Sequence, residues 1–175
     1  MGGRASTEPH GIAAVTRVLE GRGVAYELVE HDATYSAAAE ARAIGADPEA
    51  TAKTVALRDH DGYRLAVVPA SERLDVRRAR EVLGATHHLR LATEEELQRD
   101  FPAFDVGALP PFATTPLPEI VDVRLLRHAQ VTCAGGEHRS SVLIDALELL
   151  RITEPRVADI CMRAEDRRQE NLPSF

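Results

Sequence analysis

Residues 51–69 read TAKTVALRDHDGYRLAVVP, and this stretch predicts a β-hairpin at the centre of the fold. The runs 51–57 and 63–69 are mainly apolar, as expected of strands that are buried on both faces. Between them, Asp59-His60-Asp61-Gly62 ends in the Asp-Gly pair that favours a tight hairpin turn. We therefore place the other elements of the chain around this hairpin.

Helix and strand patterns alternate on both sides of the hairpin. Apolar residues at helical spacing, with capping residues nearby, predict helices over 12–20, 36–44, 75–83, 94–99 and 145–151. Short apolar runs predict strands over 24–29, 86–91, 119–122, 130–134, 140–144 and 157–161. Such interleaving predicts one α+β domain over 11–162, with a mixed, largely antiparallel, barrel-like sheet and surrounding helices. We expect residues 1–10 to form a flexible leader and residues 163–175 a flexible charged tail.

The composition is that of a soluble globular protein, with 44% hydrophobic and 28% charged residues. No apolar stretch approaches the roughly 20 residues of a membrane-spanning helix, and the N-terminus lacks the apolar core of a secretory signal. Cys133 and Cys161 lie in apolar contexts and are predicted to be reduced, buried thiols; nothing in the sequence supports a disulfide between them. The net charge of -7 argues against a non-specific nucleic-acid coat. We therefore expect a cytoplasmic protein that binds neither membranes nor DNA.

Lys53 is the single lysine of the chain. The other members of its 21 lysines and arginines are all arginines. It lies at the start of the first strand of the hairpin, where a charged side chain is costly without a partner or a task. A lysine offers a compact ammonium with a tunable pKa, whereas an arginine offers a fixed planar fork. We therefore predict a functional role for Lys53.

Several common catalytic patterns are absent from the sequence. It contains no G-x-S-x-G, H-E-x-x-H, C-x-x-C, Walker or G-x-G-x-x-G motif. His87 and His88 are adjacent on a predicted strand, so they point to opposite faces and cannot chelate one metal together. Metal catalysis and covalent Ser or Cys catalysis are therefore poorly supported, and we expect neither a metal nor an organic cofactor.

Two further segments are candidates for ligand binding: the loop 107–112 and the turn 135–138. In the loop, Gly107 lets backbone amides approach a ligand closely, and Pro110 and Pro111 stiffen the second half of the segment. Exposed amides in a rigid loop suit a carbonyl or carboxylate oxygen. From spacing alone, a plain proline-rich connector and a turn histidine in solvent remain the simpler explanations of these segments.

A series of motifs follows the order and spacing of a known family. The motifs are Ala52-Lys53-Thr54-Val55, Leu65-Ala66-Val67-Val68-Pro69-Ala70, Leu74-Asp75, Leu91-Ala92-Thr93-Glu94-Glu95-Glu96-Leu97, Gly107 to Phe112 and Ile120-Val121-Asp122. Together they resemble the YbaK family of aminoacyl-tRNA deacylases, which includes the editing domain inserted in bacterial prolyl-tRNA synthetases. Upstream, His31 is similar to the histidine that often ends the family's first strand. The resemblance covers residues 12–161, and it depends on the order of the motifs rather than on any one of them.

The resemblance implies roles for individual residues. Lys53 matches the family's strand lysine, which lies near the terminal adenosine and its phosphate. The family's G-x-x-x-P loop matches Gly107-Ala108-Leu109-Pro110-Pro111, whose backbone is expected to hold the aminoacyl carbonyl. His138 looks like the histidine found in a subset of members, and Gly135 of the same turn is expected to contact substrate. One departure is Ala113, where many members have glycine, which would narrow the pocket or change the bend of the loop.

The function implied by the resemblance is that of a trans-editing hydrolase. It would deacylate mischarged aminoacyl-tRNA that carries a small amino acid of the Ala, Ser, Thr or Cys class. Because an aminoacyl ester is already activated, its hydrolysis needs positioning, a water molecule and oxyanion stabilisation rather than a strong protein nucleophile. Lys53, Gly107 and His138 are the expected catalytic residues, with Lys53 anchoring a phosphate or ribose rather than forming a Schiff base.

The expected partners are the acceptor 3′ end of aminoacyl-tRNA and an aminoacyl-tRNA synthetase. Two other functions stay open at this point. One is a non-catalytic module that holds a tRNA 3′ end or a synthetase, and the other is a hydrolase of small esters or amides on the same scaffold. Turnover of mischarged tRNA distinguishes the first from the leading hypothesis, and turnover of a simple aminoacyl ester favours the second.

Overall fold

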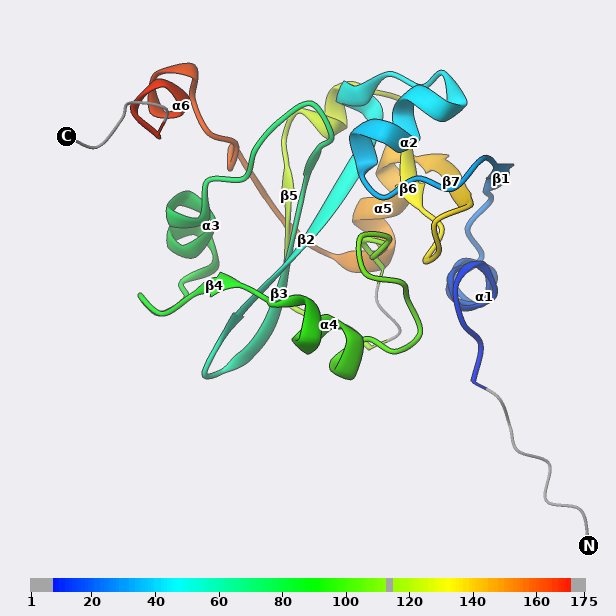
Figure 1. Cartoon of the computed structure of the whole chain (residues 1–175), viewed down its shortest axis with the longest axis horizontal. Helices are drawn as coiled ribbons and strands as arrows, with labels where there is room; N and C mark the ends of the chain where they lie inside the picture. The colour runs from blue at the N-terminus through cyan, green and yellow to red at the C-terminus, as the bar shows by residue number, and fades with distance from the viewer. Residues whose placement is uncertain (1–7, 113–114, 171–175) are drawn as a thin grey trace, which may run out of the picture.

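The predicted hairpin is the centre of a five-stranded sheet in the structure, a computed structural model that describes residues 8–112 and 115–170 (Figure 1). Its strands β2 (Ala52–Asp59) and β3 (Gly62–Pro69) pair antiparallel along their whole length. The short β4 (Arg90–Leu91) pairs with β2, and β5 (Glu119–Asp122) and β8 (Arg156–Ala158) continue the sheet beyond β3 in parallel. The sheet is therefore mixed, with the hairpin strands buried between their neighbours.

A second, three-stranded sheet is antiparallel throughout. Its order is β1 (Glu27–Glu30), β7 (Ser140–Asp145) and β6 (Gln130–Ala134), so the strands predicted on either side of the turn 135–138 pair as a second hairpin. A parallel bridge between Thr51, directly before β2, and Thr132, in the middle of β6, joins the two sheets. These strands confirm the predicted α+β, largely antiparallel domain, although the two sheets do not close into a barrel.

The helices of the described residues are α1 (Ile12–Gly21), α2 (Ala37–Ile44), α3 (Val76–Leu83), α4 (Glu94–Asp100), α5 (Ala146–Thr153) and α6 (Ala164–Glu170), with the 3-10 turns η1 (Pro48–Ala50) and η2 (Leu125–Arg127). Ser36 and Asp75 accept hydrogen bonds at the start of α2 and α3, and Thr93 and Glu96 form a capping box at α4. Helix α6 lies within the tail that we expected to be flexible. None of the described helices is long and apolar enough to cross a membrane.

Two hydrophobic clusters lie on opposite faces of the five-stranded sheet. Along β3, Leu65 and Val67 belong to the first cluster, and Ala66 and Val68 belong to the second. This alternation is the period of two expected of a strand that is buried on both faces. The first cluster fills the space between the two sheets, whereas the second lies under α3 (Figure 1).

The strand predicted over 86–91 is wrong for most of its length. Only Arg90 and Leu91 pair with β2, opposite Arg58 and Leu57. Ahead of them the chain makes a turn, closed by the hydrogen bond from the Leu89 amide to the Thr86 carbonyl at 3.1 Å. Both cysteines are free and buried, as predicted. Residues 1–7, Ala113, Thr114 and 171–175 lie outside the described residues.

Candidate functional site

Gly107 of the predicted loop lies against His138 of the second hairpin. Gly107 has a φ of +87°, and a Cβ added there would lie 3.3 Å from the carbonyl oxygen of Tyr35 and 3.7 Å from Cε1 of His138. Only glycine adopts this backbone conformation at low cost, and only glycine leaves this approach open. Two segments that are distant in sequence therefore meet at this point.

The turn that carries His138 is held firmly in place. The Gly135 amide donates to the Ser140 carbonyl at 2.9 Å, and the Asp105 amide donates to the Gly136 carbonyl at 2.9 Å. The Glu137 carboxylate accepts from the Ile12 amide at 3.2 Å and from the Ser140 hydroxyl at 2.7 Å. These bonds tie the turn to α1 and to the segment that leads into the predicted loop. Gly135 is therefore part of the support under His138.

The His138 ring is half-buried and retains an unused polar atom. Its centroid lies 4.6 Å from that of Tyr35, with the two rings tilted by 45°. The backbone carbonyl oxygen of His138 accepts a hydrogen bond of 2.8 Å from the Thr34 amide. Within the described residues, its buried Nδ1 has no hydrogen-bond partner. Because buried polar atoms are usually satisfied, this unused hydrogen-bonding capacity marks His138 as a candidate functional residue.

The loop after Gly107 is a rigid wall. Residues 108–112 are all buried, and Leu109 and Phe112 pack in the first cluster. The Ala108 amide already donates to the Asp105 carbonyl at 3.0 Å. In the described part of the chain, no hydrogen bond engages the amides of Gly107 and Leu109. These two amides are thus among the donors that the loop can offer to a ligand oxygen.

Lys53 carries its side chain on the other face of the five-stranded sheet. In the register of the hairpin, Lys53 lies opposite Val68, a residue of the second cluster. Its Nζ donates a hydrogen bond of 2.6 Å to the backbone carbonyl of Glu72. Burial, with smaller contributions from the nearby Arg73 and Arg167, lowers the pKa of the Lys53 ammonium, and Cys161 and Glu72 partly offset this effect.

The predicted site residues therefore fall into two groups. Gly107, the loop to Pro111, Gly135 and His138 form one group, joined by the close approach at Gly107 and by the hydrogen bonds of the turn. Lys53 forms the other, since no hydrogen bond or ring contact among the described residues joins it to Gly107 or His138. The loop packs in the first cluster and Lys53 lies on the side of the second, so the two groups lie on different faces of the hairpin.

Sequence reasoning missed a buried polar chain beside the His138 turn. His31 Nε2 lies 2.9 Å from the Ser141 hydroxyl, which donates to the Glu40 carboxylate. Glu40 is buried, and burial raises its pKa. The resemblance had singled out only His31. The partners on α2 and β7 lie far along the chain, so no local spacing could have indicated them.

Tyr35 and Thr54 were also missed. Tyr35 is 74% exposed although its ring lies against His138. Thr54 follows Lys53, so its side chain leaves β2 on the opposite face, toward the first cluster; its buried hydroxyl has no partner among the described residues. An exposed aromatic cannot be read from sequence, because exposure depends on tertiary packing.

Two cavities lie apart from the His138 turn. One of about 740 Å³ is lined by residues of α1 and α4 and by 101–104, and includes none of Lys53, Gly107 and His138. A smaller one of about 110 Å³ is lined by Pro111, Phe112 and Glu119 among others. The Glu119 carboxyl keeps one oxygen without a partner in the described residues, and burial raises its pKa to about 8.

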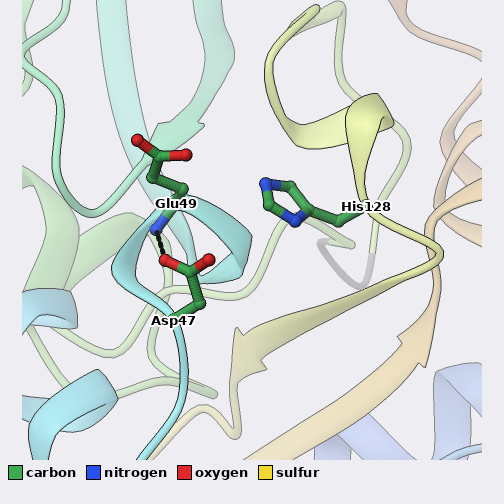
Figure 2. A group of neighbouring side chains, drawn as sticks. All are labelled: Asp47, Glu49 and His128. Carbon is green, nitrogen blue, oxygen red and sulfur yellow. Dashed lines mark hydrogen bonds between the residues drawn. The ribbon is translucent and has the colours of Figure 1, made fainter.

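One group of side chains has the donor types of a metal site. Figure 2 shows Asp47, Glu49 and His128, whose candidate ligand atoms all lie within 4.8 Å of one another. Carboxylate and imidazole groups together suit divalent transition metals. Asp47 already accepts the Glu49 amide at 2.9 Å as the cap of η1. None of the predicted site residues belongs to this group, and its exposed carboxylates are explained without a metal.

Comparison with known proteins gives a consistent result. A family model for the aminoacyl-tRNA editing domain matches residues 31–152. A solved protein proposed to be a trans-editing enzyme for prolyl tRNA synthetase is 33% identical, with a TM-score of 0.77; the match covers 87% of this chain and 97% of that one. A scaffold protein used in the computational grafting of epitopes is 29% identical, with a TM-score of 0.77 and the same coverage of 87% and 97%. The hypothetical protein APE2540 is 27% identical, with a TM-score of 0.76 and coverage of 85% and 99%. None of the curated proteins matches the chain.

Proposed function

Since the chain belongs to the aminoacyl-tRNA editing domain family, we propose that it is a hydrolase that deacylates mischarged aminoacyl-tRNA in trans. The family match over residues 31–152 bears out the resemblance found in the sequence. We infer further that the amino acid removed is small, of the Ala, Ser, Thr or Cys class, and that the protein works in the cytoplasm.

The observation that carries this function is the contact between Gly107 and His138, with its unengaged amides and unpartnered Nδ1 among the described residues. In hydrolysis, water adds to the ester carbon and its proton passes to the ribose oxygen as the carbon–oxygen bond breaks. Negative charge develops on the carbonyl oxygen at the addition step, and it returns to the carbonyl bond as the bond to the ribose oxygen breaks. The amides of Gly107 and Leu109 are the donors we assign to that oxygen, since fixed donors stabilise developing charge without reorganising.

His138 is assigned to the water or to the ribose hydroxyl that activates it. An imidazole is the side chain that most often serves as a general acid or base, and the position of His138 is fixed by the bonds of its turn. The reacting ester needs no covalent protein intermediate, so the buried cysteines are left without a role. In this assignment, the loop amides stabilise the oxyanion and His138 acts on the attacking water or on the ribose hydroxyl.

Lys53 is assigned a binding role away from the ester. Its ammonium has three donors, and the Glu72 carbonyl uses one of them. A backbone phosphate near the acceptor end is the anion we expect it to bind, as a point charge rather than a bidentate fork. The partial burial of Lys53 would strengthen such a contact, because screening by water is reduced there.

The preference for a small amino acid is supported by two observations. The loop wall 108–112 is buried and rich in proline, so it cannot easily move aside for a large side chain. A solved relative at 33% identity is proposed to edit for prolyl tRNA synthetase. Exclusion by shape is the way in which an editing site rejects larger, correctly matched amino acids.

The decisive experiment is deacylation of a panel of tRNAs charged with Ala, Ser, Thr, Cys and Pro, using the wild type, Lys53→Ala and His138→Ala. We expect the wild type to hydrolyse at least one of the small aminoacyl esters and both variants to be slower. Far-UV circular dichroism and thermal unfolding check that the variants remain folded. If the wild type leaves every ester of the panel intact, this function is wrong and a binding module is the better description.

A further inference from the structure

We propose that Tyr35 is the platform on which the terminal base of the substrate's acceptor end stacks. This inference rests on the proposed function, because it assigns a contact to the same substrate. Tyr35 lies in the connection between β1 and α2, next to the Gly107–His138 contact. Three properties of this residue support the assignment: its exposed ring, its rigid backbone and its position beside the ester site.

Tyr35 differs from the other aromatic residues that the structure describes. Its side chain is 74% exposed, so one ring face is open to solvent even though the other side of the ring approaches His138. The remaining aromatic residues contact other side chains or pack in or against the first cluster; they are Tyr26, Tyr63, Phe101, Phe104 and Phe112. Among the described residues, the ring contact of Tyr35 is the one with His138, so its large exposed surface is available to a ligand.

The backbone around Tyr35 is fixed although its ring is free. The His31 amide donates to the Arg139 carbonyl at 3.0 Å, and the Thr34 amide donates to the His138 carbonyl at 2.8 Å. Directly after Tyr35, the Ser36 hydroxyl accepts from the Ala39 amide and begins α2. The ring is therefore presented on a rigid segment, and stacking on it costs little backbone entropy.

The position of Tyr35 matches the place of a terminal base. With the ester carbonyl at the Gly107 and Leu109 amides, the ribose lies between that ester and the base. Gly107 approaches the Tyr35 backbone, and His138 lies 4.6 Å from the Tyr35 ring, so the ring is one side chain away from the ester site. A nucleobase stacks readily on tyrosine, whichever base it is.

The charge of the chain favours a contact of this kind. At a net charge of -7, the protein gains little from general attraction to phosphates. Stacking is independent of charge and is worth about 1–3 kcal/mol per base, equivalent to a roughly 5- to 150-fold change in affinity. One aromatic platform with Lys53 at a phosphate is then enough to hold a short acceptor end.

The test is a cycle of two changes, one in the protein and one in the RNA. The probe is an uncharged acceptor-stem minihelix, either intact or with an abasic 3′-terminal nucleotide, and the dissociation constants are measured for the wild type, Tyr35→Ala and Tyr35→Phe. We expect removal of the base to weaken binding of the wild type and of Tyr35→Phe about 5- to 150-fold. For Tyr35→Ala, the intact and abasic minihelices should bind equally. Leu147→Ala, which removes a 75% exposed side chain on α5, is the matched control and should behave as the wild type.

The inference is wrong if Tyr35→Ala keeps the full preference for the intact base, or if the wild type has no such preference or does not bind the minihelix. The experiment tests the stacking inference separately from the deacylase function. A base preference that depends on Tyr35, found in a protein without hydrolytic activity, would leave the stacking contact in place and remove the hydrolysis. Hydrolysis by a protein that shows no preference for the intact base would support the deacylase function and contradict the stacking contact.

Discussion

The ammonium of Lys53 donates a 2.6 Å hydrogen bond to the backbone carbonyl of Glu72. A carbonyl is neutral, so this bond orients the ammonium without neutralising its charge. Burial and the nearby Arg73 and Arg167 lower the pKa of Lys53, because each of them disfavours the charged form. An anion that binds there would offset this effect.

Lys53→Ala should therefore lower kcat/KM for deacylation by roughly 10- to 150-fold, the effect of losing one hydrogen bond to a charged group. Lys53→Arg should not restore the wild-type value, because the planar guanidinium is larger and carries its donors in a different geometry. Steady-state deacylation measures both effects, and urea unfolding verifies the fold. Full activity in Lys53→Ala would remove the lysine from the mechanism.

Gly107→Ala should both destabilise the protein and slow deacylation by at least about tenfold. Positive φ alone costs a non-glycine residue roughly 1–2 kcal/mol. Gly84→Ala is the matched control, since Gly84 has a φ of +62° and no atom within 4 Å of an added Cβ, whereas at Gly107 the Tyr35 carbonyl lies at 3.3 Å. Urea unfolding and deacylation are measured for both variants. Equal losses of activity in the two would show that the Gly107 contact has no special role.

Ser141→Ala should lower the free energy of unfolding by about 1–3 kcal/mol. The change removes the hydroxyl between His31 and the buried Glu40, and an unsatisfied buried group bears its desolvation penalty in full. Ser71→Ala, at an exposed serine, is the control and should change stability little. Urea denaturation at neutral pH gives both values. A neutral effect of Ser141→Ala would mean that water replaces the hydroxyl.

Glu119→Gln should stabilise the protein at pH 8 but not at pH 4. The folded pKa of Glu119 is about 8, above its usual value of 4.5. Between these values the unfolded state has released the proton and the folded state still binds it, so the free energy of unfolding falls as pH rises. At 1.36 kcal/mol per pKa unit, the fall is on the order of 4–5 kcal/mol, and glutamine abolishes it.

The difference in unfolding free energy between Glu119→Gln and the wild type, measured in urea from pH 4 to pH 9, isolates this one group from the other carboxylates. It should grow through the window from 4.5 to 8 and level off above it. A difference that is the same at every pH would show that the carboxyl of Glu119 is solvated.

Local chemistry made much of the fold predictable. The hairpin of β2 and β3 follows from two apolar runs around an Asp-Gly turn, and the caps at Ser36, Asp75 and Thr93 each act on residues two to three positions away. The strand expected over 86–91 is wrong for most of its length because the chain turns between Thr86 and Leu89, and only Arg90 and Leu91 pair with β2. Structure can therefore be predicted from neighbouring residues where it is caused by neighbouring residues, as in turns and helix caps.

The candidate site was less accessible from the sequence. Spacing and the family resemblance indicated Gly107, His138 and Lys53, but the contact between the first two joins a loop to a hairpin turn. No local pattern in the sequence indicates Tyr35, because its exposure of 74% depends on how distant parts of the chain pack around it. The catalytic and binding roles of these residues stay predictions until the variants are measured.

The order of residues alone specified most of the strands and helices, a lysine out of place among arginines, and the family that the motifs resemble. Only the tertiary structure decided which face of the five-stranded sheet Lys53 and the Gly107 loop each lie on. Lys53 and Thr54 are neighbours in the chain, yet the pleat of β2 directs one to the second cluster and the other to the first. Which cluster faces the loop at Gly107 depends on how two sheets and their helices pack, and packing is a property of the whole chain rather than of any segment.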